Sequence, residues 1–239
     1  MNEKIVHVTT NPVLSRTNSQ TESSRLNPLV HFMQSSTLTL ISVEGNVCGG
    51  TRTVLENLRK QGYAVFMHDA SHWDPPPDST KVDDSLAARV CVHYAHVSRV
   101  LDAIDPKDVK TLPDGQPVVF VERWIESAEQ VFLRTASQTT LSQEGVRLWT
   151  ELVRLLNIAQ RRVDAYVYLE MHPQTTYERL VARSPSLKDI SNKYVDQVHF
   201  HYTDYIKRLT LNHHRILRLK DSNVNVNDIE KELVRLFLQ

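Results

Sequence analysis

The stretch that decides the fold is TLISVEGNVCGGTRTVLENLRK, residues 39–60. Its first part is rich in β-branched residues and has the length and composition of a buried parallel strand, which we place over 37–43. A turn with three glycines follows over 44–50. Apolar residues at helical spacing then predict a helix over 54–61 that stops at Gly62. A glycine turn between a strand and a helix directs backbone N–H groups and the helix N-terminus toward one point, and this arrangement binds anions.

Gly45 and Gly50 have the spacing of a phosphate-binding loop, in which a lysine and then a serine or threonine follow the second glycine. Here Thr51 takes the lysine position and Arg52 comes one position later, so the ammonium group that contacts the β- and γ-phosphates is missing. Thr51 or Thr53 can still offer a hydroxyl to Mg²⁺. Two interpretations stay open, a degenerate phosphate loop and a tight turn without a ligand. The candidate loop residues are Gly45, Asn46, Gly49, Gly50, Thr51, Arg52 and Thr53.

The rest of the chain alternates strand and helix patterns. Apolar runs predict further strands over 63–67, 117–121, 165–169 and 215–219, and three- and four-residue spacing predicts helices over 86–104, 124–136, 143–159, 173–183, 193–210 and 226–238. This alternation predicts an α/β, P-loop kinase-like three-layer fold with a central five-stranded parallel sheet. We assign the domain to 37–239. Residues 1–36 are polar and aperiodic, which predicts a disordered N-terminal tail.

Composition argues against several function classes. Basic and acidic residues are balanced at 28 each, so the bulk charge predicts no nucleic-acid partner, and no run approaches the ~18 apolar residues of a membrane span. Only Cys48 and Cys91 are present, so we expect no disulfide framework and an intracellular, cytoplasmic setting. The N-terminus leaves a mitochondrial transit peptide as the alternative. The histidines, among them His199 and His201, lack companions at ligand spacing, so no metal site is predicted.

Short motifs occur in an order that resembles one known family. They are ISVEGN at 41–46, YAHVSRV at 94–100, VER at 121–123, YLE at 168–170, RLVAR at 179–183 and KYVDQVH at 193–199. In content, order and spacing they are similar to motifs of the deoxynucleoside kinase family, which includes cellular deoxycytidine kinases, mitochondrial thymidine kinases and the herpesvirus thymidine kinases. Because the family includes viral members, the resemblance also implies that the protein could be viral and then lie in the cytoplasm of a host cell.

The resemblance implies a reaction and its cofactors. Members of this family use ATP and Mg²⁺ to transfer the γ-phosphate to the 5′-hydroxyl of a deoxynucleoside. The family's Glu-Arg pair is kept as Glu122 and Arg123, which implies catalytic roles for both. The family's carboxylate base after the second strand aligns with His68, and Asp69 stands next to it. Trp73 aligns with a tryptophan that contacts the nucleoside.

The substrate-binding positions are only partly kept. The arginine of the family's substrate helix is kept as Arg99, whereas the glutamine that pairs with the base falls on Val92, beside His93. The aspartate that holds the 3′-hydroxyl falls on Ala128, beside Glu129. One residue along a helix turns the side chain by about 100°, so a neighbour is a poor geometric substitute there.

Two functional interpretations follow from these replacements. The arginine-rich lid keeps Arg179 and Arg183 only. Loss of one electrostatic partner of a transferring phosphoryl group typically costs on the order of 10²–10³ in rate. Several losses favour a pseudokinase that keeps the fold as a binding module, and the alternative is an active deoxynucleoside kinase that uses shifted residues. The resemblance also implies a homodimer that pairs through the helices 86–104 and 143–159.

Overall fold

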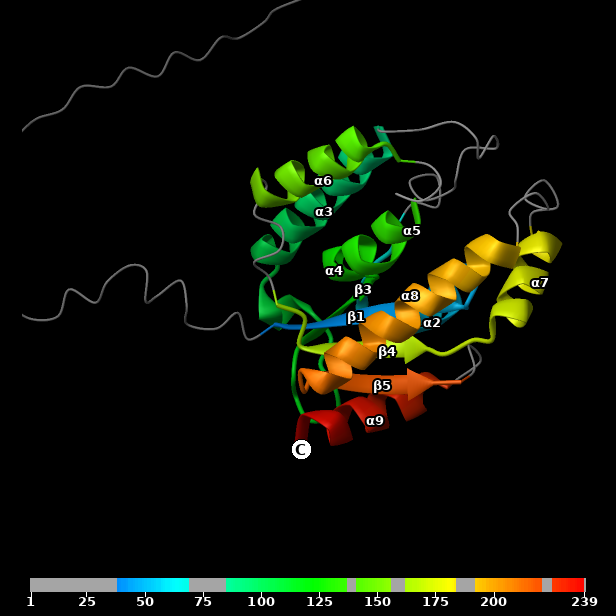
Figure 1. Ribbon diagram of the computed structural model, residues 1–239. Coiled ribbons are helices and arrows are strands. Elements are labelled where there is room, and N and C mark those ends of the chain that lie inside the picture. The colour runs from blue at the N-terminus through cyan, green and yellow to red at the C-terminus, as the bar shows by residue number, and fades with distance from the viewer. Residues whose placement is uncertain are drawn as a thin grey trace, which may run out of the picture. The chain divides into compact units, whose positions relative to one another are not determined.

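A central sheet of five parallel strands organises the fold in this computed structural model (Figure 1). The strands lie in the order β2-β3-β1-β4-β5, with bounds β1 Thr39–Gly45, β2 Ala64–Phe66, β3 Val118–Glu122, β4 Ala165–Leu169 and β5 Arg215–Leu219. Each neighbouring pair in this sheet is parallel, so the predicted five-stranded parallel sheet is confirmed. Parallel neighbours need long crossover connections, and helices supply them.

The structure describes residues 38–68, 85–136, 141–155, 162–183, 192–220 and 225–238, without the side chains of 85–87. Residues 36–239 form one compact unit that contains all of the elements described below. The predicted tail over 1–36 lies outside the described residues and stays a prediction. Within the described ranges, no helix combines the length and the apolar character that a membrane span requires.

Side-chain alternation along the strands builds one core on each face of the sheet. In β1, Leu40 belongs to one core, and Ile41 and Val43 belong to the other. In β3, Val119 joins the core of Leu40, and Phe120 joins the core of Ile41. Both faces of these strands are buried, and this explains why they read as continuous apolar runs in the sequence.

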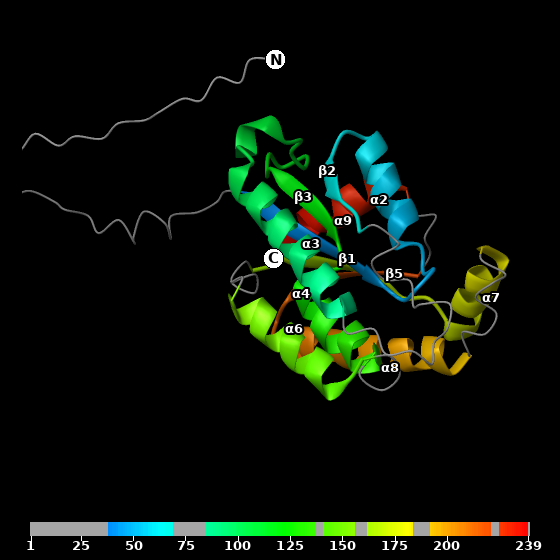
Figure 2. The same ribbon diagram turned by 90° about the horizontal axis from the view of Figure 1, so that it is seen from above.

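Helices cover both faces and make the three layers that the sequence predicts (Figure 1, Figure 2). One face carries α2 (Thr51–Lys60) and α9 (Val226–Leu238). The other face carries α3 (Ser85–Ala103), α6 (Gln143–Leu155), α8 (Asn192–Leu211) and a helical segment over 125–136. Helix α7 (Pro173–Arg183) packs against α8, and the short 3₁₀ turn η2 (Pro106–Asp108) follows α3.

Three elements depart from their predicted boundaries by two residues or more. Strand β1 covers Thr39–Gly45 instead of 37–43, so it includes the first two residues of the predicted turn. Helix α2 begins at Thr51 instead of Val54, because Gly50 takes a left-handed backbone conformation (φ 98°) that turns the chain directly into the helix. The predicted helix over 124–136 is not uniform. It consists of α4 (Ile125–Ser127), the π-helix η3 (Ala128–Leu133) and α5 (Arg134–Ala136). π-Helical turns are rare and are frequent at functional sites.

Candidate active site

The glycine loop between β1 and α2 is closed by its own Asn46. The Oδ1 atom of Asn46 accepts a hydrogen bond from the Val47 amide at 2.8 Å, and the Asn46 carbonyl accepts one from the Gly49 amide at 3.0 Å. A Cβ atom on Gly49 would lie 2.9 Å from that carbonyl oxygen, so the turn requires glycine there. The Nδ2 atom of Asn46 donates to the Val195 carbonyl at 3.2 Å, which ties the loop to α8.

The first turn of α2 presents a hydroxyl where the phosphate-loop motif has a lysine. The Oγ1 atom of Thr51 donates to Oε1 of Glu122, at the end of β3, over 3.1 Å. Arg52 turns toward the end of β2, where its Nη2 atom donates to the His68 carbonyl at 2.6 Å. Thr53 is exposed. The lysine position therefore holds a neutral side chain bonded to a carboxylate, and Arg52 is engaged with the backbone of another segment.

Both carboxylate oxygens of Glu122 accept hydrogen bonds. Oε1 accepts from Thr51, and Oε2 accepts from the backbone amide of His68 at 3.1 Å. Glu122 is buried at the carboxyl end of β3, the edge at which open parallel sheets place their ligands. The side chain thus connects α2, β3 and the residues that follow β2.

His68 directs its Nε2 atom into the protein. Nε2 lies 3.2 Å from the Arg123 carbonyl and 3.2 Å from the Tyr94 hydroxyl, and this hydroxyl donates to the same carbonyl at 3.1 Å. A carbonyl can only accept, so Nε2 carries the proton in this arrangement. Burial, followed by the His93 ring at a centroid distance of 4.5 Å, holds the pKa of His68 well below its ordinary value. The ring is therefore neutral at neutral pH.

Arg123 lies beside the glycine loop in a left-handed backbone conformation (φ 49°), which is uncommon for a residue other than glycine. Its Nη2 atom donates to the carbonyls of Gly45 and Asn46 at 3.3 and 3.4 Å. Its guanidinium group lies over the Phe132 ring, 4.7 Å from the centroid. Backbone conformations of this kind are concentrated at functional sites, where the surrounding structure imposes them.

A second buried carboxylate, Glu44, belongs to the cluster and is missing from the residues that sequence reasoning selected. Its Oε1 atom accepts from the Ser42 hydroxyl at 2.6 Å and from the Trp124 amide at 3.2 Å, and its Oε2 atom accepts from the Tyr202 hydroxyl at 3.2 Å. Complete burial raises the pKa of Glu44 in spite of these donors. A glutamate at the end of an otherwise apolar strand was the signal that could have found it.

Helix α3 brings His93, and not Val92, to this cluster. The His93 ring contacts His68, and the next residue, Tyr94, is buried. Val92 is 65 % exposed, and Arg99, two turns further along the same face, is exposed as well. The structure therefore does not place the predicted substrate residues Val92 and Arg99 beside the histidine.

The other predicted residues lie on η3, on α7 and in segments outside the described chain. Glu129 is exposed on η3. Helix α7 carries Arg179, which is half-buried, and Arg183, which is exposed. Asp69 and Trp73 lie outside the described residues, and their predicted roles stay untested. In the part of the chain that the structure describes, no group of three or more His, Cys, Asp or Glu side chains is placed to hold a metal ion.

The donor set fits the phosphate chemistry only in part. Backbone amides at the start of α2 and the nearby Arg123 guanidinium suit an anion, and Glu122 with Thr51 supplies the oxygen ligands that Mg²⁺ prefers. The cation that would follow Gly50 in the motif is replaced by Thr51. The loop therefore offers less positive charge than the motif normally provides.

Comparisons with known proteins agree with this architecture. The family model described as deoxynucleoside kinase matches residues 41–237. Among solved structures, the chain is similar to a deoxyadenosine kinase from M. mycoides, determined with the products dCMP and a flexible dCDP bound. That match has a TM-score of 0.62 and 15 % sequence identity, and it covers 84 % of this chain and 98 % of the other. No curated protein matches the chain. At this identity, the structural likeness shows the fold alone.

Proposed function

Because the chain belongs to the deoxynucleoside kinase family, we propose that it is a kinase homologue with a degraded phosphoryl-transfer site. It keeps the fold as a pseudokinase or binding module, and its transfer activity is weak or absent. The reaction to be tested is the family reaction, the ATP-dependent 5′-phosphorylation of deoxynucleosides.

The observation that carries this proposal is the neutral side chain at the lysine position of the loop. Thr51 donates its hydroxyl to Glu122, and Arg52 is bonded to the His68 carbonyl. Phosphoryl transfer depends almost entirely on positioning and on stabilising the charge of the transferred group. A missing cation of this kind costs on the order of 10²–10³ in rate, and nothing in the geometry of Arg52 replaces it.

The residue at the base position supports the same proposal. A general base needs a free lone pair, and the Nε2 atom of His68 carries the ring proton that faces the Arg123 carbonyl, so Nε2 does not accept a proton in this arrangement. Burial also holds the pKa of His68 well below its ordinary value, which makes the ring a weak proton acceptor. The proton acceptor is therefore weakened, and the loop cation for the phosphate is missing.

The second candidate function is an active deoxynucleoside or thymidine kinase that uses shifted residues. The observation in its favour is the retained pair Glu122 and Arg123 beside a closed glycine loop. In this alternative the protein uses ATP and Mg²⁺, with Glu122 and Thr51 holding the ion and the loop amides holding phosphate. His93 would then act in place of Val92, since its ring is the one that reaches His68.

An assay with labelled ATP and the four deoxynucleosides separates the two candidates. We expect product at background level and little ATP-dependent rise in Tm. Product that forms with the wild-type chain and disappears in Glu122→Ala or Arg123→Ala would establish the kinase and overturn the pseudokinase. A gain-of-function variant gives a second readout. Thr51→Lys should raise the affinity for ATP, while Thr53→Lys, which adds the same charge at an exposed position of the same helix, should not.

The homodimer and the cellular setting are part of this proposal. Helices α3 and α6 pack together and expose Val92, Leu148 and Leu155, an apolar set that suits a second copy of the chain. Sedimentation of Leu148→Glu against wild type tests the pairing.

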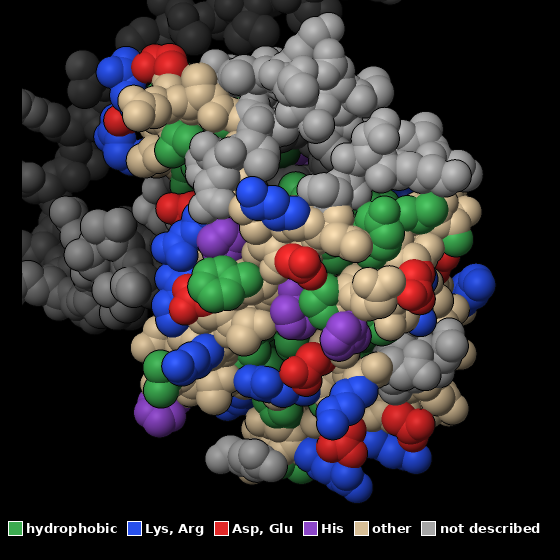
Figure 3. Space-filling model, turned by 45° about the vertical axis from the view of Figure 1, so that its right-hand side comes forward, with side chains coloured by type: hydrophobic (Ala, Val, Ile, Leu, Met, Phe, Trp, Pro, Cys, Tyr) green, Lys and Arg blue, Asp and Glu red, His purple; other side chains and the backbone are tan. Residues whose placement is uncertain are grey.

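Figure 3 shows acidic and basic side chains interspersed on the described part of one face, which gives no support to a nucleic-acid partner. We place the protein in the cytoplasm, that of a host cell if its origin is viral.

A further inference from the structure

Glu44 is buried near the carboxyl end of β1, and the proposed function assigns it no role. Its contacts lead to Arg123, whose guanidinium lies beside the glycine loop. Within the described residues, the Nε atom of Arg123 has no hydrogen-bond partner, and the bonds from its Nη2 atom to the loop carbonyls are long, at 3.3 and 3.4 Å. The direction of the guanidinium therefore depends on the backbone that carries it.

The backbone of Arg123 is held in a conformation that it would not adopt by itself. Its φ of 49° brings the Cβ atom close to a carbonyl oxygen, a conflict that glycine avoids because it has no Cβ atom. Strand β3 ends one residue earlier, where Glu122 pairs with Val43 of β1. The chain thus leaves the sheet at Arg123, and contacts with neighbouring segments must impose the turn.

Hydrogen bonds hold both peptide groups that flank Arg123. The Arg123 amide donates to the Val43 carbonyl at 3.0 Å. In the next peptide group, the Arg123 carbonyl accepts from the Tyr94 hydroxyl at 3.1 Å. The Trp124 amide, at the other end of this group, donates to Oε1 of Glu44 at 3.2 Å. Because a peptide group is planar, holding its two ends fixes ψ of Arg123, and Glu44 holds one of them.

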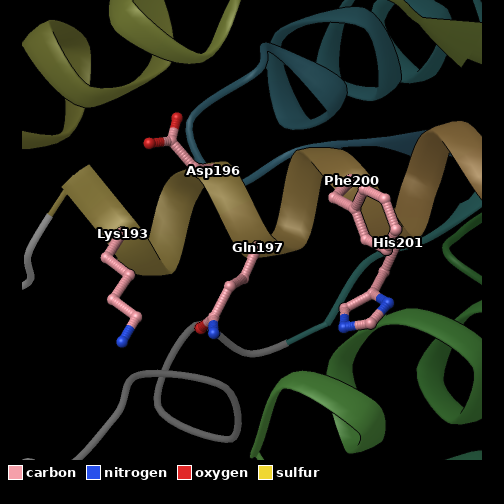
Figure 4. A pocket seen from close by; sticks show the side chains of 5 residues that line it. All are labelled: Lys193, Asp196, Gln197, Phe200 and His201. Atoms are coloured by element: carbon pink, nitrogen blue, oxygen red, sulfur yellow. The ribbon is translucent and has the colours of Figure 1, made fainter.

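The carboxyl group of Glu44 is itself held on two sides. Oε1 also accepts from the Ser42 hydroxyl at 2.6 Å, and Oε2 accepts from the Tyr202 hydroxyl at 3.2 Å. Tyr202 comes from the buried face of α8, whereas Phe200 is among the side chains that line a pocket on another side of this helix (Figure 4). The carboxyl group therefore cannot turn away from the Trp124 amide without losing a contact with β1 or α8.

We propose that Glu44 is a positioning residue, which keeps Arg123 in its left-handed conformation through the Trp124 amide. The guanidinium is thereby aimed at the carbonyls of Gly45 and Asn46, and it holds the glycine loop in its closed form. Without Glu44 the peptide group turns, the guanidinium leaves the carbonyls, and the loop opens more often. This inference rests on the proposed function, in which the loop belongs to the binding module, and it gives Glu44 no step in phosphoryl transfer.

The two cysteines of the chain can report this opening without any nucleotide. Cys48 is half-buried in the glycine loop, and Cys91 is buried on α3. Labelling of the folded full chain with iodoacetamide, followed by peptide mass spectrometry, gives a rate for each thiol. Cys48 reports opening of the loop, and Cys91 reports unfolding of the domain. A residue that only stabilises the domain changes the Cys91 rate alone, because its contacts persist when the loop opens.

Replacements of Glu44 separate its reach from its chemistry. Glu44→Ala should raise the Cys48 rate about 10-fold or more, since the buried Trp124 amide loses its partner. Glu44→Gln keeps an acceptor for this amide and can donate to the Tyr202 hydroxyl, so its Cys48 rate should stay close to that of the wild type. Glu44→Asp keeps the carboxyl group but is one methylene shorter. It should resemble Glu44→Ala, and it supplies the measurement if the alanine variant does not fold.

A matched control lies on the same strand. Val43 is buried on the other face of β1, and Val43→Ala should raise the Cys91 rate and leave the Cys48 rate unchanged. The same pattern in Glu44→Ala would overturn the proposal, since Glu44 would then only stabilise the domain. A Cys48 rate in Glu44→Gln as high as in Glu44→Ala would overturn it as well.

Arg123→Ala tests whether Glu44 acts through the guanidinium. This variant should raise the Cys48 rate by itself, and the addition of Glu44→Ala should then have no further effect. An effect of Glu44→Ala that keeps its full size in the Arg123→Ala background would refute the proposed route. Product in the labelled-ATP assay would overturn the pseudokinase alone, because the cysteine labelling uses no nucleotide.

Discussion

Replacing Thr51 by valine isolates the hydrogen bond that stands in place of the loop lysine. Valine keeps the shape and the β-branching of threonine but cannot donate to Oε1 of Glu122. Both residues are buried, so the abandoned carboxylate oxygen gains no water in exchange. A hydrogen bond to a charged group contributes roughly 1.5–3 kcal/mol. We expect Thr51→Val to lower the free energy of unfolding by about 2 kcal/mol, which in a domain of this size lowers Tm by about 4–8 °C.

The control for this substitution lies two residues further along the same helix. Thr53 is exposed, and Thr53→Val makes the same chemical change there, with an expected effect within about 0.5 kcal/mol. Thermal and urea unfolding at pH 7, followed by circular dichroism, measure both variants. Equal losses of stability in the two variants would refute the reasoning. So would a Thr51→Val effect that keeps its full size in a Glu122→Ala background, because the acceptor is then absent.

Three further substitutions test the buried cluster through unfolding measurements. The pKa of His68 is lowered in the folded protein, so below the ordinary histidine pKa of 6.5 the unfolded chain binds a proton that the folded chain does not. The free energy of unfolding should therefore fall by about 1.4 kcal/mol for each pH unit below 6.5. The His68→Gln variant should lose this slope between pH 5 and 6.5. Glu44 has a raised pKa and binds its proton in the folded state, so stability should fall as pH rises above 4.5, and Glu44→Gln should remove this part of the pH dependence. Gly49→Ala should lower the free energy of unfolding by about 1–3 kcal/mol, because the new methyl group would lie 2.9 Å from the Asn46 carbonyl oxygen. An unchanged urea midpoint would show that the loop backbone can shift to accommodate the methyl group without loss of stability.

The sequence predicted the sheet well because each of its strands is a short apolar run bounded by turn residues. Local propensity placed strand β1 to within two residues, although the strand continues through Glu44 and Gly45 into the predicted turn. The start of α2 was placed too late. The helix begins at Thr51, where polar residues carry no apolar period, and only the left-handed Gly50 marks its start. The π-helix η3 was missed for a related reason, since its extra residue per turn has no compositional signature.

The candidate site was less predictable, because the sequence does not say how a helix is rotated about its axis. Motif alignment assigned the base-reading position to Val92, whereas packing of Tyr94 into the core rotates Val92 outward and His93 toward His68. The role of Glu44 depends on Tyr202, a residue 158 positions away, and no local pattern connects the two. Position along the chain was thus predictable, and orientation required the packed structure.

The balance of charge around the loop explains how the fold remains stable without the lysine. Glu44 and Glu122 are both buried, and the buried guanidinium of Arg123 interacts with both carboxylates. An excess of buried negative charge is costly. Neutral donors satisfy Glu122, and burial favours the protonated form of Glu44. A site that is satisfied in this way needs no ATP to hold it together, and this supports a role in which the fold is kept for binding while phosphoryl transfer is lost.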